Sequence, residues 1–127
     1  MKKLLVAVLL MFPMSQASAD SLYDKCMDGA VTNPDFAKCG GEWMARADVQ
    51  LNQAWKELNV GMGERELSKK ALLVEQRLWN AYKEESCSFY DHTDFGRMGD
   101  VIEFPSCRAR VIEQRVKELK SYRPEEY

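Results

Sequence analysis

The chain has 127 residues and a formal net charge of −2 at pH 7. This length suits one domain with a modest hydrophobic core and is too short for several domains. The acidic balance argues against nucleic acid or anionic lipid as a partner.

The first residues have the organisation of a secretory signal peptide. Lys2 and Lys3 precede an apolar stretch over residues 4–12, and small residues end at Ala19. We expect cleavage between Ala19 and Asp20, which gives a signal peptide at 1–19, one helical domain at 20–127 and a periplasmic or secreted protein. The apolar stretch is shorter than the roughly 20 residues of a membrane-spanning helix, so we expect no stable membrane insertion. Without Lys2 and Lys3, 16 basic residues face 20 acidic ones, a net charge of −4.

Four cysteines follow the predicted cleavage site, at Cys26, Cys39, Cys87 and Cys107. An even number in a small exported domain indicates two disulfides. We favour Cys26 with Cys39 and Cys87 with Cys107, because each pair closes a short segment between helix ends. The alternative, Cys39 with Cys87, would join the open end of a helical hairpin. The cysteines are widely spaced and His92 is the only histidine, so we expect no metal site and no cofactor.

Residues 21–30 are predicted to form a short N-terminal helix, and a longer helix is predicted from Asn33 to about Leu58. Asn33, Pro34 and Asp35 are typical of a helix start. One apolar stripe runs along this longer helix at three- and four-residue steps: Trp43, Ala47, Leu51, Ala54 and Leu58. Gly40 and Gly41 are expected to weaken its first turns.

Two further helices are predicted, and both are amphipathic. After the interruption at residues 61–63, the second long helix carries the apolar stripe Leu67, Ala71, Val74, Leu78 and Tyr82. A C-terminal helix begins near Ser106, carries Ala109, Ile112, Val116 and Leu119, and ends before Pro124. The short connection after residue 61 makes the two long helices antiparallel neighbours, and their apolar stripes are expected to form the core of the hairpin. The predicted fold is therefore all-α, an antiparallel helical hairpin with a short N-terminal helix and a C-terminal helix, stapled by two disulfides.

The 19 residues from 88 to 106 show no helical period and are predicted to form an ordered loop closed by a disulfide. Loops of this length inside a compact domain are usually functional or disordered. Its carboxylates outnumber its one arginine, Arg97, and are Asp91, Asp94, Asp100 and Glu103. The loop is a candidate target-binding surface, and the alternative is a solvated connector.

Polar and aromatic residues form a second line along each long helix. The two sequence motifs that contain these residues are Ala47-Asp48-x-x-Leu51-Asn52-x-x-Trp55 and Leu72-x-x-x-Gln76-x-x-Trp79-x-x-x-Lys83-x-x-x-Cys87. Together with Cys26, Cys39 and Cys107, they resemble the LprI-type lysozyme inhibitor family from about Cys26 to Leu119. The family usually has Tyr at the position of Trp55 and Arg at that of Lys83, and lysine lacks the planar fork of arginine.

The resemblance implies an exported helical domain and the inhibition of lysozyme, a peptidoglycan-cleaving muramidase. The same residues also have a purely structural interpretation. Asp48 and Asn52 are expected near the level of Gln76, where a hydrogen-bond network could lock the hairpin. The tryptophans are then expected in the core or at its edge.

Three classes of function remain, and an enzyme is the least supported. His92 stands without any recognisable nucleophile or metal motif, so no enzyme activity is expected. An inhibitor is favoured, because an acidic protein is attracted to a basic lysozyme as its protein partner. The alternative is a non-catalytic periplasmic scaffold or stress protein, which would expose an apolar groove to another envelope partner.

Overall fold

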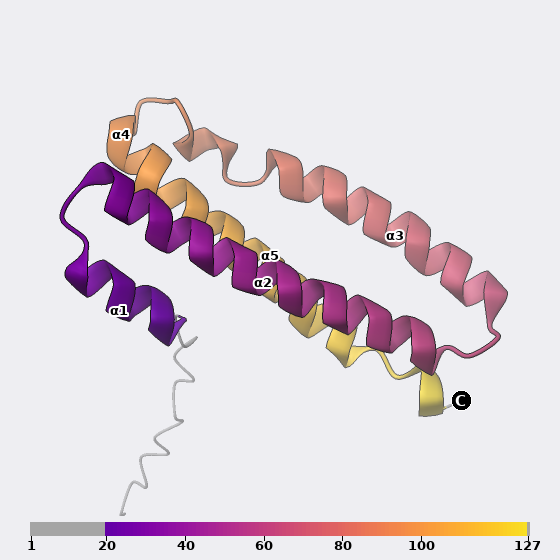
Figure 1. The fold of residues 1–127 in the computed structure, drawn as a ribbon. Helices are drawn as coiled ribbons and strands as arrows, with labels where there is room; N and C mark the ends of the chain where they lie inside the picture. Colours follow the sequence, from indigo (N-terminus) through magenta and orange to yellow (C-terminus); the bar gives the residue numbers. More distant parts are fainter. Residues whose placement is uncertain (1–19, 127) are drawn as a thin grey trace, which may run out of the picture.

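The computed structural model describes residues 20–126, and every regular element among them is helical (Figure 1). The elements are, in chain order, α1 (Ser21–Gly29), α2 (Asn33–Gly61), α3 (Glu66–Glu85), η1 (Ser88–Tyr90), α4 (Gly96–Met98), η2 (Gly99–Glu103), α5 (Phe104–Ser121) and η3 (Pro124–Glu126). The all-α class, the short N-terminal helix, the antiparallel pair and the C-terminal helix are confirmed. The predicted signal peptide lies outside the described residues. None of the described helices is long and apolar enough to cross a membrane.

A capping box precedes α2, which begins at Asn33 as predicted. The N-cap is Thr32, whose hydroxyl accepts a hydrogen bond from the Asp35 amide, while the Asp35 carboxylate accepts one from the Thr32 amide at 2.8 Å. Two amides that would otherwise lack partners at the helix start are thereby satisfied. Pro34 fits the first turn, where no amide hydrogen is needed.

The core forms where α2 packs along α5, the most extensive contact between elements (Figure 1). The apolar stripes predicted for these two helices are both buried. The main core cluster is Ala47, Leu51, Ala54, Leu58, Met62, Leu72, Ile112, Val116 and Leu119. Trp43 is also buried, with an exposed fraction of 2%. Burial of these side chains is the main favourable contribution to folding.

The expected weakening of the first turns of α2 at Gly40 does not occur, because α2 is continuous from Asn33 to Gly61. Gly40 is instead a point of close packing. A Cβ atom at this position would lie 2.6 Å from the Cβ of Pro105, closer than packed atoms can approach. The missing side chain therefore allows the start of α5 to rest directly on α2.

The apolar stripe predicted to bury α3 is exposed, and this prediction was wrong. α3 runs antiparallel to α2 but stands apart from it over much of its length (Figure 1). Leu72 is its only buried residue. The physical reason is that α5 occupies the apolar face of α2, so α3 turns a different face inward. That face carries Leu72, Gln76 and Trp79.

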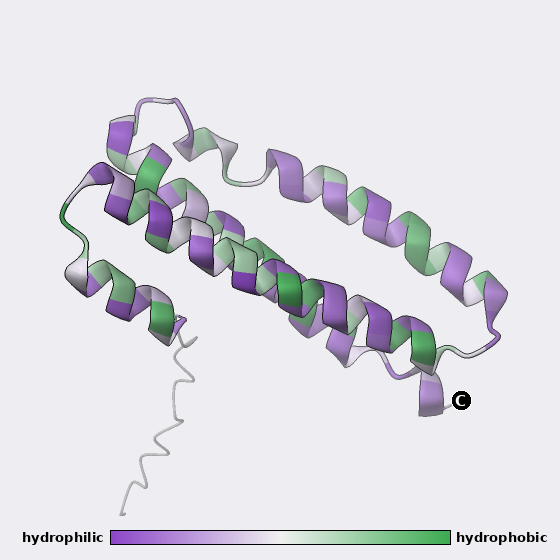
Figure 2. Ribbon diagram, in the orientation of Figure 1, coloured by the Kyte–Doolittle hydropathy of each residue, from purple (hydrophilic) through white to green (hydrophobic). Residues whose placement is uncertain are grey.

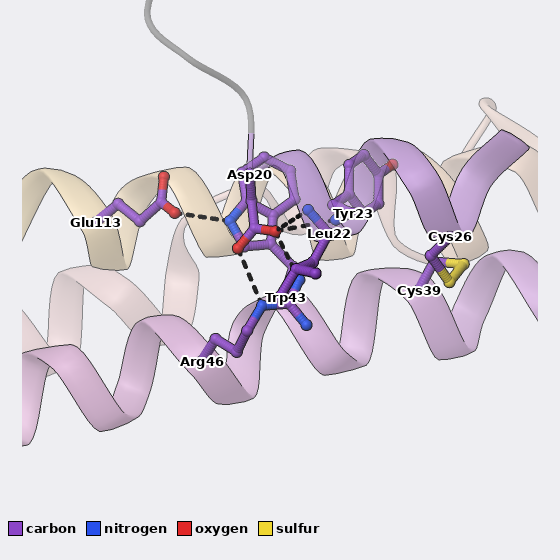
Figure 3. Close-up of polar contacts among 8 residues, drawn as sticks. All are labelled: Asp20, Leu22, Tyr23, Cys26, Cys39, Trp43, Arg46 and Glu113. Carbon is purple, nitrogen blue, oxygen red and sulfur yellow. Dashed lines mark hydrogen bonds and ion pairs between the residues drawn. A yellow bond between two sulfur atoms is a disulfide. The ribbon is translucent and has the colours of Figure 1, made fainter.

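Both favoured disulfides are present, Cys26–Cys39 and Cys87–Cys107. The first ties α1 to α2, and a charged clamp adds to it (Figure 3). The carboxylate of Asp20 accepts hydrogen bonds from the Leu22 and Tyr23 amides, both at 2.9 Å, and so caps α1. The same carboxylate accepts two bonds from Arg46 of α2, at 2.8 and 3.0 Å. The residue predicted to follow signal cleavage is thus fixed to the body of the domain.

Replacing Asp20 tests this clamp and sets a pH dependence. The hydrogen bond from Arg46 holds the pKa of Asp20 below its ordinary value of 3.8. Its stabilising contribution is therefore present above pH 3.8 and disappears as the pH falls through the lowered pKa. Asp20→Ala should lower the free energy of unfolding by about 1 kcal/mol at neutral pH. Asp20→Asn keeps a capping side chain and should cost less.

Denaturant unfolding of the three proteins at neutral pH and at about pH 2 provides the measurement. At the lower pH the difference between Asp20 and its replacements should shrink. An equal loss at both pH values would show that the carboxylate charge contributes nothing.

Candidate functional site

The segment between Cys87 and Cys107 is anchored at both ends. The disulfide holds the two Cα atoms 5.9 Å apart. Beside it, Arg108 of α5 donates hydrogen bonds to the carbonyl oxygens of Glu84 and Ser86, at 2.9 and 3.0 Å. These bonds satisfy carbonyls at the end of α3, where the helix itself leaves them without partners. We call residues 88–103 the closed loop.

The closed loop is ordered, and its second half is helical, contrary to the absence of helical period in its sequence. It contains η1, α4 and the single π-turn η2, which leads directly into α5. Its fold depends on Gly99, where a Cβ atom would lie 2.5 Å from the carbonyl oxygen of Tyr90. The close approach of two backbone segments therefore requires glycine at this position.

An aromatic cluster forms the outer part of the closed loop, and sequence reasoning missed it. The rings of Phe89, Tyr90 and Phe95 are in mutual contact, with centroids 4.0 to 5.9 Å apart. Phe89 and Phe95 nevertheless remain 58% and 55% exposed, and Met98, three residues after Phe95 in the sequence, is 49% exposed. We call Phe89, Phe95 and Met98 the apolar tip. The sequence feature that could have indicated this cluster is the high number of large apolar residues in residues 88–103, a segment without a periodic buried face.

The four predicted carboxylates of the closed loop have different roles. Asp100 is mostly buried; it accepts a 2.6 Å hydrogen bond from the His92 amide and forms an ion pair with Arg97 at 3.6 Å. It therefore holds the loop in shape. Asp91 is half-buried and lies 3.5 Å from the His92 ring. Asp94 and Glu103 are exposed, so they are the loop carboxylates most accessible to a partner.

Asp91, His92 and Asp100 bring one potential ligand atom each within 4.8 Å of one another. The His92 ring lies 3.5 Å from the Asp91 carboxylate and 3.6 Å from the Asp100 carboxylate, and His92 is 80% exposed. Exposed groups of this kind are common on protein surfaces, so we assign no metal to them.

The motif residues of α3 face α5 and meet a buried arginine. Arg115 is 2% exposed, and its Nε donates a 3.0 Å hydrogen bond to the Gln76 side chain. The guanidinium carbon lies 5.9 Å from the centre of the Trp79 ring, and the Lys83 ammonium lies 5.8 Å from the same ring. Such distances allow attraction between a cation and the aromatic face. Gln76 and Trp79 therefore attach α3 to α5.

Two carboxylates complete this network around Arg115. Its guanidinium forms ion pairs with Glu75 at 2.7 Å and with Glu118 at 2.5 Å, and the Tyr122 hydroxyl donates to Glu75 at 2.6 Å. Partial burial raises the pKa of Glu75, but the bonds from Tyr122 and Arg115 outweigh burial and leave that pKa below its ordinary value. Arg115 escaped sequence reasoning because charged residues are rarely buried. Its position between Ile112 and Leu119, at helical spacing, was the available signal.

The motif residues of α2 are divided between the core and the surface. Leu51 is buried, and Trp55 is half-buried against the core cluster. Asp48 and Asn52 are exposed, and neither side chain forms a hydrogen bond or ion pair with any residue in the described part of the chain. The expected hydrogen-bond network with Gln76 is therefore absent from residues 20–126. The reason is that α3 diverges from α2, and Gln76 bonds to Arg115 instead.

The different environments of Arg115 and Asp48 lead to opposite expectations for stability. Arg115→Ala removes a buried cation from partners on two helices and should cost about 3 kcal/mol of unfolding free energy. Asp48→Ala changes an exposed residue and should stay within about 0.5 kcal/mol. Denaturant unfolding monitored by circular dichroism measures both. A loss for Asp48→Ala as large as that for Arg115→Ala would contradict the surface position of Asp48.

Comparisons with known proteins give one result. No curated protein and no solved structure matches the chain significantly. The family described as "Lysozyme inhibitor LprI" matches residues 25–119. This range includes all four cysteines, the two sequence motifs on α2 and α3, and the closed loop. The match covers most of the chain, and the protein therefore belongs to the LprI lysozyme inhibitor family.

Proposed function

We propose that this protein is an exported inhibitor of lysozyme that uses the closed loop to block the substrate cleft. The observation that carries the proposal is the apolar tip, three exposed side chains on a loop fixed by a disulfide. Family membership supports the class of target. Two disulfides and the N-terminal sequence support a periplasmic or secreted location.

The apolar tip has the properties of a binding anchor. A few large apolar or aromatic residues usually carry most of the affinity of an interface, and they do so when they enter a pocket and lose water. The Cys87–Cys107 bond and the Asp100 contacts order the loop before binding. Less conformational entropy is then lost on association.

The chemistry of the target explains why such a loop suffices. A lysozyme cleaves its glycan in a cleft with two carboxyl groups, one on each side of the scissile bond. A rigid wedge that occupies this cleft excludes the glycan and needs no chemistry of its own. The proposed inhibitor is accordingly not an enzyme.

Charge supports the encounter with a basic lysozyme. The mature chain would carry a net charge of −4, and the exposed Asp94 and Glu103 lie on the same loop as the apolar tip. Opposite charges raise the association rate, and salt screens this contribution. The acidic groups thus guide the loop, and the apolar tip provides the contact.

A scaffold that binds another envelope protein is the second candidate, because an apolar groove is present. A groove of about 400 Å³ runs between α3 and α5, and its walls include Trp79, Tyr82 and Val111. This is the feature that the scaffold interpretation required. In that case the closed loop would not affect lysozyme.

The direct test is the lysis of a cell-wall suspension by a basic animal lysozyme in the presence of the purified mature protein. Wild-type protein should slow lysis. Phe95→Ala combined with Met98→Ala should raise the inhibition constant at least about tenfold, because it removes exposed anchors. Val49→Ala is the matched control, since Val49 is 67% exposed on α2 and far from the loop in sequence. An unchanged inhibition constant in a variant with intact helices would contradict the role of the loop.

A charge variant separates guidance from contact. Asp94→Asn with Glu103→Gln should lower the association rate and weaken its salt dependence, while the dissociation rate changes little. Asp28→Asn with Glu64→Gln makes the same change in net charge at exposed sites outside the loop. If both double variants lower the association rate equally, the attraction to lysozyme comes from the overall charge of the protein and not from the closed loop. The absence of inhibition by wild-type protein would favour the scaffold.

A further inference from the structure

The apolar stripe of α3 faces solvent although it has the pattern of a buried seam. Its members, which we call the outer stripe, are Leu67, Ala71, Val74, Leu78 and Tyr82. Leu67 is 84% exposed, Leu78 69%, Tyr82 62% and Val74 56%. Figure 2 shows hydrophobic residues spaced along α3 on a helix that stands apart from α2. Soluble monomers rarely expose a continuous apolar surface of this length.

The fold does not use the outer stripe. α3 is already attached through its other face, where Leu72 joins the core and Gln76 bonds to Arg115. The Cys87–Cys107 bond fixes its C-terminal end. A helix of 20 residues is about 30 Å long. The outer stripe thus extends along a rigid, anchored rod that is free to meet another helix.

The spacing of the outer stripe fits a helical partner. From Leu67 to Leu78 its residues follow at alternating steps of four and three, the repeat that lets two helices pack along a common seam. Three charged residues recur at seven-residue intervals beside it: Lys70, Arg77 and Glu84. Residues in such flanking positions contact the facing helix and determine its identity and orientation.

We propose that the occupant of the outer stripe is a second copy of this chain, with the two α3 helices antiparallel across a twofold axis. In this arrangement Val74 of each copy packs against Leu78 of the other. Lys70 of each copy then lies opposite Glu84 of the other, which gives two attractive pairs. The antiparallel helix dipoles are also favourable.

A parallel pair fits less well. It would place Lys70 opposite Glu75 of the second copy, a half-buried carboxylate held by Arg115 at 2.7 Å and by Tyr122 at 2.6 Å within its own chain. Glu84 is exposed, and its contacts within its own chain, with Lys83 at 3.3 Å and Arg108 at 3.9 Å, are longer. The antiparallel arrangement leaves that network intact. It places Arg77 next to Arg77 of the second copy at the axis, an unfavourable contact that a substitution can remove.

The dimer has a consequence for binding. The closed loop follows the C-terminal end of α3, so an antiparallel pair carries its two loops at opposite ends. Each copy then presents its own apolar tip. The association itself does not depend on the proposed inhibition.

Sedimentation equilibrium over a range of protein concentrations tests the proposal. Wild-type protein should form a reversible dimer. Leu78→Glu should weaken it at least tenfold, whereas Val49→Glu, a matched exposed site on α2, should leave it unchanged. Arg77→Gln should tighten it. Circular dichroism should show intact helices in each variant, because all these side chains are exposed.

Charge reversal tests the orientation. Lys70→Glu and Glu84→Lys should each be monomeric alone, since each brings like charges together twice. Mixed in equal amounts, they should form a heterodimer with both pairs attractive. A wild-type protein that stays monomeric at every concentration would overturn the proposal, and so would a mixture that does not associate. Loss of lysozyme inhibition by a folded Leu78→Glu variant, with wild-type protein monomeric, would instead assign the outer stripe to the target.

Discussion

The packing of α2 against α5 is the constraint on which the rest of the structure depends. Both helices place their apolar stripes in this contact, and the main core cluster lies along it. The buried Gly40 lets Pro105 approach α2 closely at one end. Because the contact uses the apolar face of α2, α3 cannot occupy it. The position of α3 and the exposure of its outer stripe both follow.

Attachment of α3 then relies on polar contacts and a covalent bond. Arg115 of α5 contacts Glu75 and Gln76 near the middle of α3, and the Cys87–Cys107 bond joins the C-terminal end of α3 to the start of α5. A buried cation stabilises only while its partners remain in place, so this network specifies one position for α3. The two ends of the closed loop are also held in place, because they follow the end of α3 and precede the start of α5. A binding surface on such a loop is preorganised by the fold.

The sequence predicted those features that depend on local pattern. The stripe from Trp43 to Leu58, the stripe from Ala109 to Leu119 and the pairing of the cysteines are all confirmed. The choice between competing stripes was not predictable, because helical periodicity identifies an apolar face but not its partner. The sequence thus assigned Leu67 and Leu78 to the core, while the structure exposes them. The buried position of Arg115 and the ring cluster around Phe95 depend on contacts distant in sequence or on loop geometry.

The central claim is that the closed loop, not the exposed motif face of α2, contacts lysozyme. Amide hydrogen exchange measured with and without a basic lysozyme tests it most directly, because it reports on every segment of the same unmodified protein. The account predicts slow exchange in α2 and α5 in both states and slower exchange over residues 88–103 only when lysozyme is bound. Unchanged exchange in the loop, with new protection confined to the surface around Asp48 and Asn52, would contradict it.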